Sequence, residues 1–365
     1  MTPARPSLPV SWTTALPPLA ILVLIAVWGR DLAPVLVAVV AAVLAGAVLA
    51  AVHHAEVVAH RVGEPFGSLV LAVAVTVIEV ALIVTLIVSG GPETASLARD
   101  TVFAAVMITC NGILGLSLFV GALRQHVAMF NAEGTGAALA TVTTLAALSL
   151  VLPTFTTSHP GPEFSASQLT FAAVASLALY GMFVVTQTVR HRDFFLPVRQ
   201  GDTPVAEEHA APPTAQAAAT SLGLLVLALV AVVGLAKVES PAIEAGVKAV
   251  GFPPSFVGVV IALLVLLPET LAAFRAARRG LVQTSLNLAL GSAMASIGLT
   301  IPTIAVASIW IDGPLVLGLE ATQLVLLVLT VVVGVLTVVP GRATRLQGGI
   351  HLVLLAAFLF LAVNP

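Results

Sequence analysis

Two glutamates stand alone in the middle of long apolar runs: Glu79 in FGSLVLAVAVTVIEVALIVTLIVSG and Glu269 in PSFVGVVIALLVLLPETLAAF. Each run is long enough to cross a bilayer as a helix, for which about 20 apolar residues suffice. A carboxylate near the centre of a membrane is costly, so such a residue is by default a functional-site hypothesis. Two of them, in matching places in the two halves of the chain, predict a paired site for a cation or for protons. A plainer interpretation is that each glutamate is protonated and hydrogen-bonded to a neighbouring helix.

The composition places the whole chain in a membrane. Of its 365 residues, 59% are hydrophobic and only 9% are charged, whereas soluble domains carry about 25% charged residues. The apolar runs have the length of helices and not of the ten-residue strands of a barrel. A single cysteine excludes an internal disulfide framework, the net charge of -2 and the lack of a basic tract give no reason to expect nucleic acid, and the N-terminal segment does not read as a secretory signal. The fold predicted is an all-α integral membrane protein without a cofactor.

The hydropathy pattern predicts eleven transmembrane helices. They are expected at 16–29, 33–52, 66–89, 98–122, 134–153, 167–189, 217–236, 254–277, 281–310, 315–339 and 344–362. With the N-terminus in the cytoplasm, 11 of the 15 basic residues fall on the cytoplasmic side and 4 outside, namely Arg30, Arg99, Lys237 and Lys248. This bias follows the positive-inside rule and predicts a periplasmic C-terminus.

The order of helices predicts two inverted halves. Residues 1–32 form an N-terminal segment with the first helix, 33–190 a first five-helix repeat, 191–216 a polar cytoplasmic linker, and 217–365 a second five-helix repeat. An odd number of helices per half inverts one half relative to the other. Glu79 and Glu269 then occupy corresponding helices, and the next helices also align weakly, 99–122 with 282–305. Inverted repeats around a midplane site are typical of secondary transporters.

The residues around the glutamates are suited to a hard cation. Calcium takes six to eight oxygen ligands, and a carboxylate that binds the metal can bind a proton when the metal leaves. Further oxygens are expected from Thr76, Asn111, Ser292 and Ser296. Pro268 lacks an N–H, so it frees a backbone carbonyl one turn earlier; a comparable weak point is expected at Thr76. Asn287 is another polar residue at membrane depth, and His351 is expected only to pack.

Two stretches resemble the calcium/proton exchanger family of the cation/calcium exchanger superfamily. They are GEPFGSLVLAVAVTVIEV (63–80) and PETLAAFRAARRGLVQTSLNLALGSAMASIGLTIP (268–302), and the resemblance is greatest to the bacterial sodium–potassium/proton and calcium/proton antiporters. It implies that Glu79 and Glu269 bind the cation and exchange it for protons. Gly291, Ser292 and Ala293 match the family's Gly-Ser-Ala run.

The chain also departs from the family pattern. The Gly-Asn-Ala that precedes each glutamate in the family is absent from both halves, and the family's glutamine position falls near Ala295 and Ser296. The acidic segment between the halves has thinned to Asp202, Glu207 and Glu208. The loss of side-chain amides weighs against strict calcium selectivity and fits a branch that also carries monovalent cations.

The resulting hypothesis is an antiporter of a bacterial inner membrane. It would export Ca²⁺, with Na⁺ and K⁺ as further candidates, in exchange for incoming protons. Sodium/calcium exchange and monovalent-only Na⁺(K⁺)/H⁺ exchange use the same two glutamates and stay open. A channel or uniporter and an intramembrane enzyme fit less well, because apolar stretches flank each glutamate and the sequence carries no His-Glu-x-x-His or Gly-x-Ser-x-Gly motif. The ion preference, the proton stoichiometry and the oligomeric state stay open too.

Overall fold

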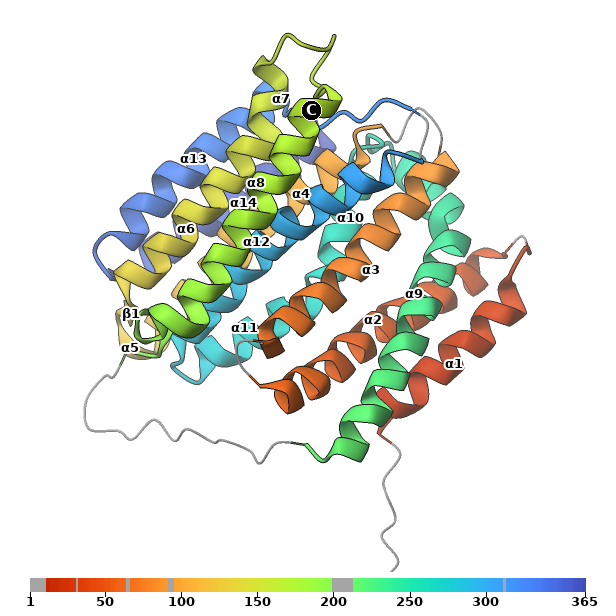
Figure 1. Ribbon diagram of the computed structural model, residues 1–365, viewed down its shortest axis with the longest axis horizontal. Helices are drawn as coiled ribbons and strands as arrows, with labels where there is room; N and C mark the ends of the chain where they lie inside the picture. Colours follow the sequence, from red (N-terminus) through yellow and green to blue (C-terminus); the bar gives the residue numbers. More distant parts are fainter. Residues whose placement is uncertain (1–10, 31, 64–65, 91–94, 199–212, 311–312) are drawn as a thin grey trace, which may run out of the picture.

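The computed structural model describes residues 11–30, 32–63, 66–90, 95–198, 213–310 and 313–365, and nearly all of them are helical (Figure 1). The first half begins with three helices, α1 (Trp12–Val27), α2 (Pro34–Val62) and α3 (Phe66–Gly90). Three further spans each contain a π-helical segment. The first is α4 (Leu97–Met107), η2 (Ile108–Ile113) and α5 (Leu114–Gln125); the second is α6 (Ala132–Ala146), η3 (Ala147–Val151) and α7 (Leu152–Phe155); the third is α8 (Ala166–Val185) and η4 (Thr186–Arg190). The second half contains the 3-10 turn η5 (Arg192–Phe195), α9 (Ala215–Ala249), α10 (Phe256–Val265), α11 (Leu267–Arg278), α12 (Val282–Ala307), α13 (Ala321–Val338) and α14 (Arg345–Val363). Two short strands, Ala128–Met129 and Arg342–Ala343, pair antiparallel.

The predicted all-α membrane fold is confirmed. Within the described residues, nine helices are long and apolar enough to cross a membrane; α10 and α11 form a tenth span if they are taken together, bent by 54°, and α1 is shorter. The expected number of eleven spans is therefore not established by length and composition. The linker residues 199–212, with Asp202, Glu207 and Glu208, lie outside the described part.

Helices α2 and α9 are much longer than predicted. They run on to Val62 and Ala249, whereas the hydropathy pattern predicted ends at residues 52 and 236. Each continues through polar residues that have partners: the His54 ring nitrogen Nε2 lies 3.0 Å from the Thr13 carbonyl oxygen, and the Lys237 ammonium lies 5.5 Å from the centre of the Trp28 ring. A long side chain can keep its charge near water while its helix continues in an apolar setting.

The hydrophobic interior is divided into two clusters. One lies among α1, α2 and α9, which run side by side at the lower right of Figure 1; the other lies among α4 to α8 and α12 to α14. Helices α3 and α10 contribute to both clusters: Ile78 and Ile261 belong to the first, Ile83 and Ala262 to the second. The elements that carry or precede the two glutamates thus lie between two separately packed bodies.

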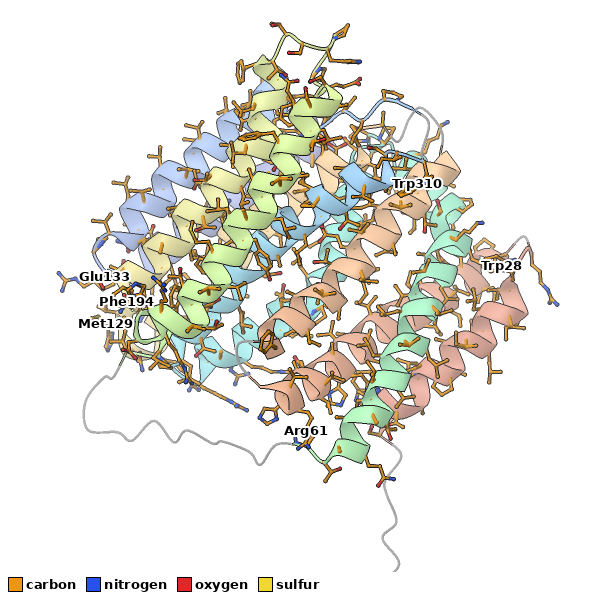
Figure 2. All side chains as sticks on the ribbon, viewed as in Figure 1. Trp28, Arg61, Met129, Glu133, Phe194 and Trp310 are labelled. Carbon is orange, nitrogen blue, oxygen red and sulfur yellow. The ribbon has the colours of Figure 1, made fainter. Side chains whose placement is uncertain are left out.

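The two ends of the bundle differ in their side chains. Trp28 and Trp310 lie toward one end and are more than half exposed, while Arg61, Glu133 and Phe194 lie toward the other (Figure 2). We call the latter the arginine end; α2, α5 and α11 finish there and α3 and α12 begin there. Exposed tryptophans at the end of a membrane helix are typical of the membrane–water interface.

The crossing of α5 and α14 depends on glycine. A Cβ atom added at Gly348 would lie 2.6 Å from the Phe119 nitrogen and 2.9 Å from the Gly115 carbonyl oxygen. We expect Gly348→Ala to destabilise the protein by about 1–3 kcal/mol, because two backbones must separate. At the neighbouring Gly349 an added Cβ meets no atom within 4 Å. Thermal unfolding in detergent should therefore show a lower midpoint for Gly348→Ala only, and equal midpoints for both variants would contradict this close crossing.

Candidate cation site

The two glutamates are positioned by helices of different construction. Glu79 lies in the middle of α3, which is unbroken, so the weak point predicted at Thr76 is not present. Glu269 lies in the first turn of α11, directly after the break at Leu266. Pro268 explains this break, because a proline inside a helix removes a backbone hydrogen bond and clashes with the preceding turn. The second-half helix, predicted as one span over 254–277 with a carbonyl freed by Pro268, is therefore divided into α10 and α11, whereas the weak point predicted in the first half is not observed.

The carboxylate of Glu79 is buried and held by a serine of the other half. The residue is 3% exposed, and the Ser296 hydroxyl of α12 donates a hydrogen bond of 2.6 Å to its Oε1 atom. Thr76, one turn earlier on α3, is also buried and lines the same cavity. A hydrogen bond to a carboxylate is stronger than one between neutral groups. Ser296 therefore fixes the orientation of Glu79.

The carboxylate of Glu269 is less constrained. Glu269 is half-buried, and its Oε2 atom is shielded from solvent without a hydrogen-bond partner among the described residues. It lies close enough to Glu79 for their charges to repel each other, and also interacts with Glu56 of α2. A shielded carboxylate oxygen without a donor is one that a cation or a proton would satisfy.

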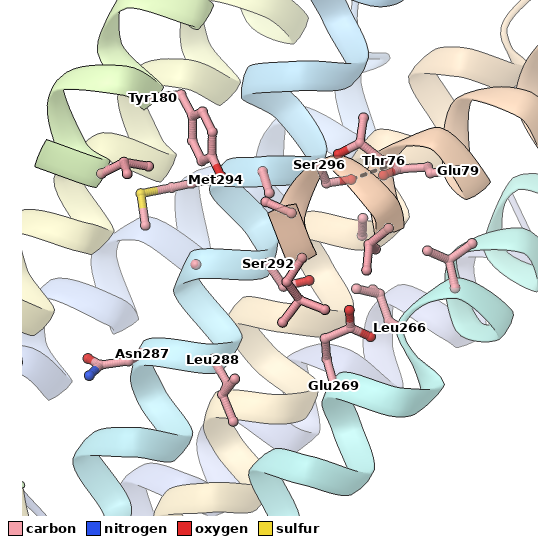
Figure 3. Close-up of a pocket in the computed structure, with 18 of the residues that line it drawn as sticks. Thr76, Glu79, Tyr180, Leu266, Glu269, Asn287, Leu288, Ser292, Met294 and Ser296 are labelled. Atoms are coloured by element: carbon pink, nitrogen blue, oxygen red, sulfur yellow. Dashed lines mark hydrogen bonds between the residues drawn. The ribbon is translucent and has the colours of Figure 1, made fainter. Parts of the chain in front are cut away.

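Both glutamates face one cavity of about 240 Å³. In Figure 3 they point toward the same space from α3 and α11, and Ser292 and Ser296 face it from α12. A Cβ added at Gly291 would meet no atom within 4 Å, so this glycine leaves space free in the wall. The polar lining side chains are Thr76, Glu79, Tyr180, Gln187, Glu269, Thr284, Asn287, Ser292 and Ser296; the rest of the lining is apolar.

The structure brings five of the six predicted site residues to this cavity, and Asn111 is not among them. Asn111 lies in η2, fully buried, where its Nδ2 donates to the Thr330 hydroxyl (2.9 Å) and its Oδ1 lies 3.1 Å from the His351 Nδ1. Its amide is therefore occupied at an interface of α13 and α14. His351, expected to pack in its helix, is buried there.

Asn287 lines the cavity but its amide is also occupied. Its Nδ2 donates to the Phe195 carbonyl oxygen (2.6 Å), and its Oδ1 accepts from Gln283 (2.8 Å). In Figure 3 its side chain points away from the two glutamates. Asn287 therefore links α12 to the turn Arg192–Phe195. This turn lies at the start of the predicted linker. That turn is part of the packed fold, with the Phe195 ring against the Phe183 ring.

The donor set suits an ion that prefers oxygen ligands. In the described part of the chain, no group of three or more His, Cys, Asp and Glu side chains gathers as a metal site. What the cavity presents instead is two carboxylates with hydroxyls around them, which are the ligands of hard cations such as Ca²⁺ and Na⁺ and not of soft transition metals.

Three residues near the site were not predicted from the sequence. Glu56 was missed because the second helix was expected to end at residue 52; its position within a longer α2 places it near Glu269. Gln187 lies in η4, at the end of a predicted helix, and nothing in its local pattern marks it. Thr300 lies four residues after Ser296, and this helical spacing is a signal that could have identified it.

The comparisons with known proteins agree with this fold. The sodium/calcium exchanger protein family matches in two segments, residues 32–189 and 220–364. The chain is 47% identical over 331 residues to y4hA of Sinorhizobium fredii (strain NBRC 101917 / NGR234), which is named as an ionic transporter, over 91% of this chain and 89% of that protein.

A second relative and a solved structure cover almost the whole chain. The chain is 33% identical over 351 residues to the sodium-potassium/proton antiporter ChaA of Escherichia coli (strain K12), over 95% of each. The structure of native YfkE superimposes with a TM-score of 0.72 at 17% identity, over 97% of this chain and 99% of that one. This protein is therefore a multi-pass membrane protein of the sodium/calcium exchanger family, a cation antiporter and not an enzyme.

Proposed function

We propose that this protein exchanges a cation for protons at a site formed by Glu79 and Glu269. The observation that carries the proposal is that both carboxylates face one cavity, with a shielded oxygen on Glu269 that has no partner in the described structure. Thr76, Ser292 and Ser296 supply hydroxyl oxygens at the same cavity. Backbone carbonyls at the α10–α11 break and water would complete the shell of a cation that takes six or more ligands.

The shared carboxylates give a physical reason for obligatory exchange. Two protons or one divalent cation neutralise the pair to the same extent. Two ionised carboxylates without a cation are strongly disfavoured in an apolar setting. The protein is therefore not expected to change from one access conformation to the other while the site is empty and doubly charged. Release of a cation must be followed by binding of protons or of another cation.

Alternating access would arise from movement of α1, α2 and α9 against the larger body. The cavity extends from Glu79 and Ser296 to Gln187 and Thr284, near the arginine end. Toward the opposite end, α10 crosses α4 so closely that a Cβ at Gly258 would lie 2.8 Å from the Thr101 nitrogen. These features support a conformation accessible from the arginine end.

We place the arginine end in the cytoplasm, in the inner membrane of a bacterium. The excess of arginines follows the positive-inside rule, and both curated relatives are bacterial. The N-terminus would then be cytoplasmic and the C-terminus periplasmic. Residues 33–190 and 217–365 would form the two inverted repeats, joined by the linker 191–216.

For the substrate we propose Na⁺ and K⁺ together with Ca²⁺. ChaA is named as a sodium-potassium/proton antiporter, and YfkE as a Ca²⁺/H⁺ antiporter. Of the amide side chains that line the cavity in the described structure, Asn287 is bound to Phe195 and Gln283, and Gln187 lies toward the arginine end. The hydroxyls and two carboxylates that surround the ion impose no rigid cage, which favours the broader range.

The proposal is tested with purified protein in liposomes that carry an imposed proton gradient and a pH-sensitive dye. We expect addition of Na⁺, K⁺ or Ca²⁺ to dissipate the gradient, and the three responses rank the ions. A channel would instead pass the cations without proton movement and would generate a membrane potential. Cation flux without proton counterflow would contradict the proposed exchange.

A further inference from the structure

The proposed site leaves one hydroxyl next to Glu79 unused. Ser292, Ser296 and Thr300 follow one another at steps of four residues along α12, so each lies about 6 Å further along the helix axis than the one before. The first two line the cavity, and Thr300 lies one turn beyond it, toward the end opposite the arginine end. The row of hydroxyls therefore continues past Glu79 on the side where the cavity stops.

Thr300 is in an unusual state for a buried polar side chain. It is 0% exposed, and its Oγ1 atom makes no hydrogen bond to any described residue. A buried hydroxyl without a partner is costly, and native proteins contain few. The hydroxyl lies close enough to the Glu79 carboxyl group to act on it as a weak hydrogen-bond donor, although the contact falls outside the geometry of a regular hydrogen bond.

The missing hydrogen bond is not imposed by the helix. Thr303, three residues later on α12, donates to the Leu299 carbonyl four residues before it (2.7 Å), and Thr270 and Thr330 make the same bond in their helices. Such back-bonding is the usual solution for a helical threonine. Thr300 does not adopt it, so its hydroxyl is available to a ligand beside Glu79.

We propose that Thr300 is a further cation ligand, used with Glu79 when the site opens toward the end opposite the arginine end. This inference rests on the proposed function and deepens it. A cation held by Glu79 has Ser296 on the cavity side and Thr300 on the far side. When α1, α2 and α9 move, the far side becomes accessible, and the Thr300 oxygen replaces oxygens that the ion leaves behind in the cavity.

The test compares three variants in membrane vesicles of both orientations, with Na⁺ and Ca²⁺ as probes of proton-coupled exchange. Thr300→Val keeps the shape of the side chain and removes only the hydroxyl. We expect it to raise the apparent KM about tenfold for cation offered from the side opposite the arginine end, with a smaller change from the other side. Thr300→Ser keeps an oxygen and should restore the wild-type KM. Thr303→Val removes a hydroxyl that is bound to the backbone and should change nothing.

The outcomes separate this inference from the function on which it rests. If Thr300→Val exchanges like the wild type, or changes the KM equally from both sides, while Glu79→Gln is inactive, Thr300 is not the proposed ligand and the two-glutamate site stands. If Glu79→Gln itself exchanges normally, the proposed function fails and this inference fails with it. The midpoint temperature of thermal unfolding of Thr300→Val should equal or exceed that of the wild type, since an unpartnered buried hydroxyl is removed.

Discussion

Glu79→Gln and Glu269→Gln are each expected to abolish proton-coupled cation exchange. Glutamine has nearly the shape of glutamate, so the fold is retained while one negative charge is lost. A unit charge at about 4 Å from a cation contributes about 4 kcal/mol even at an effective dielectric constant of about 20, which corresponds to about a thousandfold weaker binding. The amide also cannot take up and release a proton, so the exchange cycle is interrupted as well.

The liposome assay with Na⁺, K⁺ and Ca²⁺ measures this loss. Glu133→Gln is the matched control, because the same substitution then falls on an exposed residue in the first turn of α6. It should exchange at the wild-type rate. Wild-type exchange by either central variant would support the plainer interpretation, in which these glutamates are protonated residues with a structural role.

The two variants should also differ in a way that reflects their surroundings. Glu79 is fixed by Ser296, whereas Glu269 follows the helix break at Leu266 and its Oε2 atom has no hydrogen-bond partner in the described structure. Each glutamine introduces an amide N–H₂ group that needs an acceptor. At position 79 the glutamine oxygen can still accept from Ser296 and the unpartnered Thr300 hydroxyl can accept from the amide, so little stability is lost. At position 269 the amide takes the place of an oxygen that is shielded from solvent without a partner. The midpoint temperature of thermal unfolding should therefore fall more in Glu269→Gln than in Glu79→Gln.

The membrane class and the central pair of glutamates could be predicted from the sequence because both depend on one-dimensional properties. A run of apolar residues must be buried in lipid, and an isolated carboxylate inside it must have a reason. Ser292 and Ser296 could be predicted as well, since residues four apart share a helix face. Pro268 alone indicated a weakened helix before Glu269, but not that the helix would divide into two segments bent by 54°.

The length of α2 and α9 could not be predicted in this way. Hydropathy drops at His53 and Lys237, and the pattern contains no information about the partners that these helices find in each other, in α1 and in Trp28. Hydropathy therefore predicts the ends of these helices too early and leaves Glu56 in a predicted loop, whereas it lies within α2. The contacts that stabilise the extra turns of these helices are made with other helices, so a local sequence pattern does not reveal them.

Asn111 was predicted as a ligand but does not line the cavity, and the reason is a different one. The expectation assumed an α-helix with 3.6 residues per turn. Residues Ile108–Ile113 form a π-helical segment instead, which accommodates an additional residue in the turn and rotates the side chains that follow. The face on which a residue lies is then shifted, and Asn111 meets α13 and α14.

Asn111→Ala is expected to destabilise the protein by about 2–4 kcal/mol, because it leaves buried hydrogen-bonding groups without partners. Asn111 bridges three helices: its Nδ2 donates to Thr330, which in turn donates to the Leu326 carbonyl (2.8 Å), and its Oδ1 accepts from His351 Nδ1. The His351 Nε2 lies 3.2 Å from the Thr337 hydroxyl, which can donate to it. The network is complete only with the asparagine, since an alanine removes a buried partner of both the His351 Nδ1 atom and the Thr330 hydroxyl.

Thermal or denaturant unfolding in detergent measures this effect, with Asn364→Ala as the control. Asn364 is exposed at the end of α14 and donates only to the Phe360 carbonyl, so its replacement should leave the midpoint unchanged. His351→Ala combined with Asn111→Ala should destabilise by less than the sum of the two single changes, because the two side chains share one bond. The apparent KM of the folded Asn111→Ala protein for Na⁺ and Ca²⁺ should equal that of the wild type. A raised KM with unaltered stability would return Asn111 to the cation site and would require η2 to turn toward the cavity in another conformation.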